Sequence, residues 1–213
     1  MSVLRIDASI QGDHSASSAL ADLVLERIVA AHPDVPVVRR HLAQDPLPAD
    51  AWATAISGGF TPEADRSHAQ RDALALAETL AGELQQATTA VLALPLYNYG
   101  VSQHVKTWMD LACAGAPMGT RLLEGTPTVL LTTRGGAYGP GTPREGWDHN
   151  VDFLRRILCD VWGADLTVVE REFTLVGVNP ALDEFTELAA TMRRSAEEAA
   201  AKAGAALAAR HAA

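Results

Sequence analysis

Three short polar loops, each directly after an apolar run, contain the residue types in this chain that are best suited to binding a ligand. The apolar runs cover residues 3–7, 90–94 and 128–132. If these runs are parallel strands of one sheet, their carboxyl ends meet at one edge, where ligands bind in open α/β sheets. The first loop is rich in hydroxyls, the second in aromatic rings, and the third in glycine beside an arginine. Together the loops suit a phosphate, a flat ring and the polar rim of that ring.

The first of these, the serine loop (residues 9–18), carries Ser9, Ser15 and Ser17 ahead of a helical pattern. Serine hydroxyls and the free N–H groups of a helix N-terminus can bind a phosphate, and the positive end of the helix dipole favours it. The loop lacks both a Gly-Lys-Ser/Thr sequence and the G-x-G-x-x-G pattern, which favours a monophosphate over a polyphosphate. A simpler alternative is that these serines only cap the helix.

The second, the tyrosine loop (residues 95–100), places Leu96, Tyr97, Asn98 and Tyr99 directly after a buried strand. A flat heterocycle needs an apolar wall and hydrogen-bonding partners at its rim. The amide of Asn98 supplies both a donor and an acceptor. The alternative is an ordinary β-turn with its tyrosines on the surface.

The third, the glycine loop (residues 133–139), begins Thr133, Arg134, Gly135, Gly136. Paired glycines let backbone N–H groups approach a ligand closely, and such donors stabilise negative charge that develops on a reduced ring. Arg134 is expected to face either the ligand or a carboxylate elsewhere. The alternative is an ordinary Gly-Gly turn after a strand.

The order of patterns along the chain predicts a single doubly wound α/β domain over residues 1–213. A region of Pro and Gly at 43–68 contains Trp52, Ile56 and Phe60, which predicts an ordered excursion that covers a site or a partner surface. An alanine-rich helix is expected at 180–210. Strands are expected at 3–7, 35–42, 89–94, 127–132 and 166–170, and the other helices at 19–28, 73–86, 102–114 and 147–162.

Composition excludes several classes of function. The net charge of -9 argues against a nucleic-acid partner, and no apolar run approaches the ~20 residues that span a bilayer. Cys113 and Cys159 are too few and too far apart for a metal site, and they suit a reducing cytoplasm. The histidines lack metal-binding spacings, and the chain has no G-x-S-x-G nucleophile motif. We therefore expect a cytoplasmic protein with no metal, no membrane segment and no nucleic-acid partner.

Taken together, the three loops resemble the three FMN-contacting segments of the FMN-dependent NADH:azoreductase (flavin quinone reductase) family. The similarity covers nearly the whole chain and includes residues 44–48 and 74–76. The segments that carry the resemblance are Ser9…Ser15-Ala16-Ser17, Pro95-Leu96-Tyr97-Asn98-Tyr99 and Thr133-Arg134-Gly135-Gly136.

The resemblance implies a flavodoxin-like five-stranded parallel sheet in the order 2-1-3-4-5, with helices on both faces. It implies a homodimer with two sites at the subunit interface and one tightly bound FMN per subunit. NADH or NADPH would reduce the flavin and leave, and a quinone or azo compound would then enter the same pocket, so that no catalytic protein residue is needed. The FMN phosphate would lie at Ser9, Ser15, Ala16 and Ser17, its ring at Leu96, Tyr97, Asn98 and Tyr99, and the ring edge at Thr133, Arg134, Gly135 and Gly136.

The chain departs from this family pattern near residue 160. Where many relatives have Gly-Phe-x-Gly, it has Cys159-Asp160-Val161-Trp162-Gly163. Trp162 and Tyr138 are therefore expected to shape the pocket for the electron acceptor. Two alternatives stay open, namely a specialised biosynthetic reductase for one aromatic or quinone intermediate, and a flavodoxin-like electron carrier.

Overall fold

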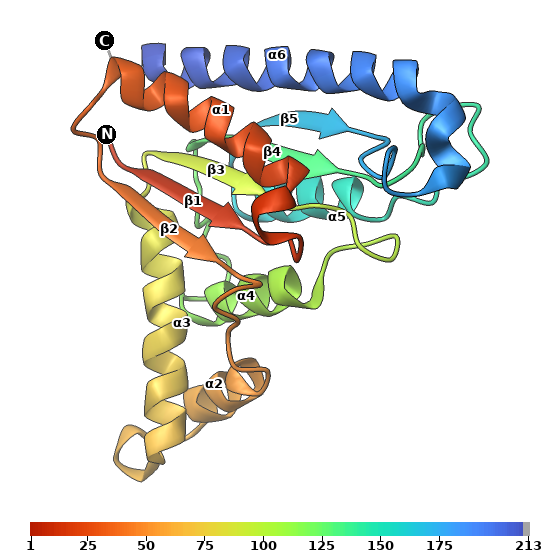
Figure 1. Cartoon of the computed structure of the whole chain (residues 1–213). Coiled ribbons are helices and arrows are strands. Elements are labelled where there is room, and N and C mark those ends of the chain that lie inside the picture. Colours follow the sequence, from red (N-terminus) through yellow and green to blue (C-terminus); the bar gives the residue numbers. More distant parts are fainter. Residues whose placement is uncertain (211–213) are drawn as a thin grey trace.

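The computed structural model describes residues 1–210, so residues 211–213 of the expected domain lie outside the described part of the chain. Its centre is a parallel sheet of five strands in the order β2-β1-β3-β4-β5, as predicted (Figure 1). The strand order reverses between β1 and β3, which is where ligands bind in doubly wound sheets. The strands are β1 (Val3–Asp7), β2 (Val37–His41), β3 (Thr89–Ala93), β4 (Pro127–Thr133) and β5 (Asp165–Arg171).

Helices cover both faces of the sheet, which confirms the predicted layers (Figure 1). Side chains alternate between the faces along each strand, so that Val91 and Val129 pack on one side and Leu92 and Leu130 on the other. One side is covered by α1 (Ala16–Ala31) and α6 (Thr186–Arg210), and the other by α3 (His68–Gln86), α4 (Gln103–Ala114) and α5 (Val151–Arg155).

The helix predicted at 147–162 is wrong at its start. Residues 147–150 belong to a loop, because the Asp148 carboxylate accepts hydrogen bonds from the N–H groups of Asn150 and Val151 and thereby ends the loop there. After α5 the chain continues as a π-helical segment, Arg156–Val161. At the carboxyl end of the chain, a 3₁₀ turn, Pro180–Phe185, precedes α6.

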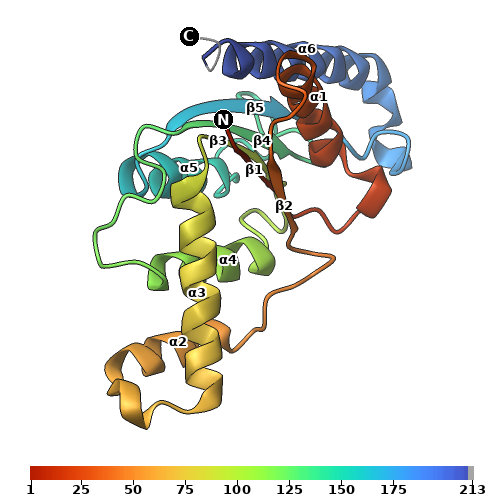
Figure 2. The ribbon, with the colours of Figure 1, turned by 90° about the vertical axis from the view of Figure 1, so that its left-hand side faces the viewer.

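The segment at 43–68 holds a short helix, α2 (Ala51–Phe60), which packs against α3 and α4. Figure 2 shows α2 at the end of α3 that lies away from the sheet. The small residues of α2 face α3, since a methyl group added at Gly58 would lie 3.0 Å from Leu74. The large apolar residues of α2 are Trp52, Ile56 and Phe60, spaced four apart and exposed.

No helix within residues 1–210 has the length and apolar character that crossing a membrane requires.

Candidate functional site

The three loops leave neighbouring strands at the carboxyl edge of the sheet and contact one another there. Backbone hydrogen bonds continue past the strand ends, from Leu96 N to Thr133 O (3.0 Å) and from Ala8 N to Ala93 O (3.1 Å). The tyrosine loop also contacts the serine loop, since Tyr97 Oη lies 3.3 Å from Ser9 Oγ and accepts the N–H of Ile10 at 3.0 Å. The structure therefore brings the predicted loops to one place.

The serine loop carries hydroxyls that are buried at the start of α1. Ser15 caps α1 by accepting the N–H of Ser18 at 3.1 Å, so the capping alternative describes this residue correctly. It does not account for Ser9 and Ser17, which are 3% and 1% exposed, or for the 3.2 Å between Ser15 Oγ and Ser17 Oγ. Among residues 1–210, the N–H groups of Ala16 and Ser17 have no acceptor. Two free amides beside a cluster of hydroxyls fit a phosphate monoester.

The tyrosine loop is a tight turn held in an uncommon backbone conformation. Tyr97 and Gly100 exchange two backbone hydrogen bonds of 3.0 Å each. Between them, Asn98 and Tyr99 have φ angles of 46° and 69°, a left-handed conformation that asparagine tolerates and that costs tyrosine about 1–2 kcal/mol. The β-turn alternative is correct about the backbone. However, left-handed residues other than glycine also cluster at ligand sites, so the turn fits the rim of a ring as well.

Arg134 in the glycine loop is buried and bound to carboxylates rather than open to a ligand. Its guanidinium lies 2.5 Å from Asp148, 2.5 Å from Glu170 and 3.3 Å from Glu172. Burial lowers the pKa of Arg134, but the charges of Glu170 and Asp148 outweigh this and hold it above its ordinary value. Of the two orientations expected for this side chain, the structure has the one toward carboxylates.

The backbone after Arg134 is shaped by contacts with the segment that follows β5. Gly135 O accepts from Leu175 N at 3.1 Å, and a methyl group at Gly135 would lie 2.6 Å from the Leu175 side chain. A larger residue would fit here only if the Leu175 side chain shifted, so this approach favours glycine. In the part of the chain that the structure describes, the N–H groups of Gly135 and Gly136 have no acceptor. These amides are thus available as donors to the edge of a ring.

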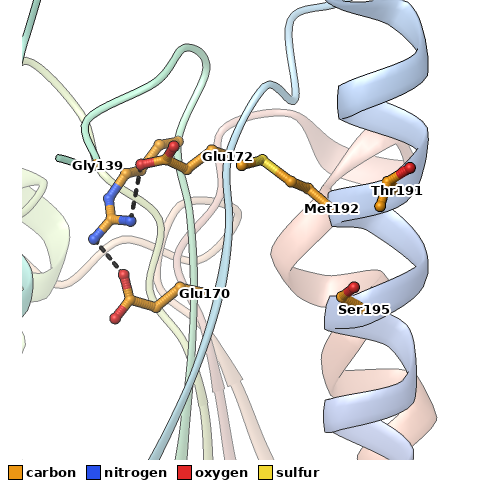
Figure 3. Close-up of a pocket in the computed structure, with 7 residues that line it drawn as sticks. Gly139, Glu170, Glu172, Thr191, Met192 and Ser195 are labelled. Carbon is orange, nitrogen blue, oxygen red and sulfur yellow. Dashed lines mark hydrogen bonds and ion pairs between the residues drawn. The ribbon is translucent and has the colours of Figure 1, made fainter. Parts of the chain in front are cut away.

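A cavity of about 350 Å³ lies between the carboxylates around Arg134 and helix α6 (Figure 3). In Figure 3 the Met192 side chain extends from α6 toward Glu172. Of the predicted site residues, this cavity includes only Arg134. It is lined by Arg134, Gly139, Glu170, Glu172, Thr191, Met192 and Ser195.

Of the two residues expected to shape the acceptor pocket, one lies at the site and the other lies at the opposite edge of the sheet. Tyr138 lies in the glycine loop, and its ring centre is 6.3 Å from that of Tyr99, so the structure brings it to the site. Trp162 is fully buried and packs edge-on against Trp108 at 5.5 Å. It lies just before β5, at the amino edge of the strands, and donates to Cys113 Sγ. The structure does not bring Trp162 to the site.

Sequence reasoning missed residues of the loop before α5. The Trp147 ring lies 5.6 Å from the Tyr99 ring, and Asp148 bonds Arg134. Asn150 is fully buried and donates to Thr132 Oγ1 at 3.1 Å. The sequence feature that could have indicated these residues is the Trp-Asp-His-Asn run after Gly146, because Asp and Asn are typical of the residues just before a helix.

No group of three or more His, Cys, Asp or Glu side chains within residues 1–210 is placed to bind a metal ion.

Comparison with known proteins shows the family of the chain. Residues 1–203 match a family model described as the flavodoxin-like fold, and the chain belongs to that family. Within it, the chain groups with proteins named FMN-dependent NADH:quinone oxidoreductase. The one from Frankia alni is 39% identical over 202 residues, which are 92% of this chain and 95% of the relative. The one from Streptomyces avermitilis is 36% identical over 206 residues, which are 94% of each chain. The family resemblance predicted from the three loops is therefore confirmed.

Two solved structures have the same fold. An azoreductase from Bacillus anthracis str. Sterne has a TM-score of 0.75 at 22% identity, covering 96% of this chain and 99% of its own. An FMN-dependent NADH-azoreductase from Bacillus anthracis str. Ames Ancestor, solved in complex with FMN, has a TM-score of 0.71 at 18% identity, covering 95% and 99%.

Proposed function

We propose that this protein is an FMN-dependent oxidoreductase that transfers two electrons from NADH to quinones, with azo compounds as a second class of acceptor. The observation that carries the proposal is the meeting of three loops, each with a different kind of donor, at the switch point of a flavodoxin-like sheet. The named relatives favour this activity over an electron carrier or a biosynthetic reductase for one compound.

The serine loop is proposed to hold the FMN phosphate. The hydroxyls of Ser9, Ser15 and Ser17 and the amides of Ala16 and Ser17 would donate to its oxygens. The N-terminus of α1 adds favourable charge. Tyr97 Oη ties this loop to the tyrosine loop, so that phosphate and ring are bound at a fixed separation.

The other two loops are proposed to orient the ring. Leu96, Tyr97, Asn98 and Tyr99 would form its wall and rim. The backbone from Thr133 to Gly136 would lie along its edge, with the amides of Gly135 and Gly136 placed to stabilise negative charge. Arg134 acts indirectly, by fixing this backbone through its carboxylates. FMN held in this way would supply two-electron redox chemistry between a nicotinamide hydride donor and the acceptor, and donor and acceptor would use the pocket in turn.

The absorption spectrum of the purified protein tests this proposal first. We expect flavin bands after isolation or after addition of FMN and removal of the excess. Oxidation of NADH with 1,4-naphthoquinone should then depend on the bound flavin. A protein that retains no FMN and oxidises no NADH would overturn the proposal.

We further propose that the chain forms one domain that works as a homodimer in the cytoplasm. Both apolar cores are built on the same sheet, which supports a single domain. The exposed Trp52, Ile56 and Phe60 on α2 form an apolar stripe of the kind that an interface covers. Cys113 and Cys159 are free thiols, as is usual in a reducing compartment.

A further inference from the structure

Three aromatic rings, from the tyrosine loop, the glycine loop and the loop before α5, lie together at the edge of the proposed ring pocket. Tyr99 contacts Trp147 and Tyr138 edge-on, with ring centres 5.6 and 6.3 Å apart. Tyr99 is 41% exposed and Trp147 50%, so the cluster offers accessible aromatic surface. Such a surface suits a flat molecule.

Arg144 lies at this aromatic cluster, and its positive charge has no carboxylate partner among residues 1–210. Its guanidinium lies 5.7 Å from the centre of the Tyr138 ring. Its Nη1 would lie 3.2 Å from a methyl group placed on Gly136, so it also reaches the glycine loop. Among residues 1–210 the Arg144 side chain makes no ion pair and no hydrogen bond, whereas Arg134 in the same loop region binds three carboxylates. The five N–H donors of Arg144 therefore remain open.

The loop that carries Arg144 is held in place by its own hydrogen bonds. Glu145, the nearest acid in the sequence, accepts the N–H of Gly141 at 2.8 Å and does not pair with Arg144. Trp147 N donates to Arg144 O at 3.1 Å, and His149 N donates to Tyr99 O at 2.9 Å. Arg144 therefore lies on a loop that is anchored beside the tyrosine loop. Glu145 is engaged by Gly141 and does not neutralise Arg144.

We propose that Arg144 is a specificity-determining residue that binds the anionic group of a molecule entering the ring pocket. The inference rests on the proposed function, because it assumes that a nicotinamide donor and an aromatic acceptor use this pocket. A guanidinium beside an aromatic wall recognises a sulfonate, carboxylate or phosphate joined to a flat ring. That anion has two sources, a charged substituent on the acceptor or the diphosphate of NADH.

The test compares charged and neutral partners in the FMN-loaded enzyme. The acceptor arm uses 1,4-naphthoquinone and 1,4-naphthoquinone-2-sulfonate. The donor arm uses NADH and 1-benzyl-1,4-dihydronicotinamide, which lacks phosphate. The variant is Arg144→Gln. Its control is Lys202→Gln, which removes the same charge from an exposed position on α6.

In at least one arm, we expect Arg144→Gln to lower kcat/KM for the charged partner about fivefold, with the neutral partner unchanged. A loss in the acceptor arm assigns the anion to the acceptor, and a loss in the donor arm assigns it to NADH. The effect should shrink as ionic strength rises. Equal losses for charged and neutral partners, no loss in either arm, or the same losses in Lys202→Gln would overturn the inference. If the wild-type enzyme fails to reduce neutral 1,4-naphthoquinone, the proposed function itself fails, and that result is separate.

Discussion

Arg134 Nε donates to Asp148 Oδ2 over 2.5 Å, while the other oxygen of Asp148 accepts the N–H groups of Asn150 and Val151 at 2.7 and 3.1 Å. One carboxylate therefore joins the end of β4 to the first turn of α5. The glycine loop leaves β4 directly beside this connection, so the ion pairs of Arg134 fix the backbone of the loop.

Removing Arg134 should cost more stability than removing any one of its acidic partners. Arg134→Met leaves Asp148, Glu170 and Glu172 close together without their cation, and we expect a loss of about 3–5 kcal/mol in the free energy of unfolding. Asp148→Asn leaves Arg134 paired with two carboxylates and keeps an oxygen for the helix start. Its loss should be about 1 kcal/mol. Urea unfolding of the FMN-free protein measures both, and equal losses would contradict this account.

Ser17 should discriminate between FMN and riboflavin, which differ only in the phosphate. Ser17→Ala removes a hydroxyl from the buried serine cluster. We expect its affinity for FMN to fall about tenfold, because hydrogen bonds to charged groups contribute about 1.5–3 kcal/mol, with riboflavin binding unchanged. Quenching of flavin fluorescence measures both affinities.

Ser18→Ala is the matched control for Ser17→Ala. The Ser18 hydroxyl is buried on the same helix turn and has no hydrogen-bond partner among residues 1–210. Its removal should therefore leave FMN binding intact. If both variants lose the same affinity, or if Ser17→Ala weakens riboflavin equally, the serine loop does not hold the phosphate.

Two substitutions at Asn98 separate the role of its amide from that of its backbone. Asn98 has a φ of 46°, a conformation that glycine adopts freely and alanine does not. We expect Asn98→Gly and Asn98→Ala both to bind FMN about fivefold more weakly, because both lose the rim hydrogen bonds. Asn98→Ala should in addition lose about 1 kcal/mol of stability in thermal unfolding. If Asn98→Gly binds FMN as the wild type does, the amide has no contact with the ring.

The sequence predicts the sheet well because β1, β3 and β4 are apolar runs that end at polar loops. It predicts α5 poorly. Apolar residues repeat with helical spacing at 147, 151, 154, 158 and 162. The helix nevertheless begins at 151, because the Asp148 carboxylate accepts the N–H of Val151. Helical spacing also does not show at which edge of the sheet Trp162 lies. The carboxylates of Arg134 stand 14 to 38 residues away, and only the folded sheet brings them together.

Phe60 is the most sensitive probe of the proposed dimer. It ends α2 and is 88% exposed, so Phe60→Asp should leave the fold and thermal stability of one chain unchanged. In a symmetric dimer the residue is buried twice, and burying each phenylalanine contributes about 1.5–3 kcal/mol. We therefore expect the dissociation constant to rise about a hundredfold or more. Sedimentation velocity should show twice the mass of one chain for the wild type and the mass of one chain for Phe60→Asp.

Leu188→Asp supplies the control for Phe60→Asp, because Leu188 is 44% exposed on α6, across the sheet from α2 (Figure 1). This variant introduces the same charge and should remain dimeric. Phe60→Asp should also retain less FMN, since the two sites are expected at the subunit interface. A wild-type monomer would refute the homodimer. A dimeric Phe60→Asp would refute only its assignment to α2, and exposed apolar residues elsewhere, such as Met118, would be tested next.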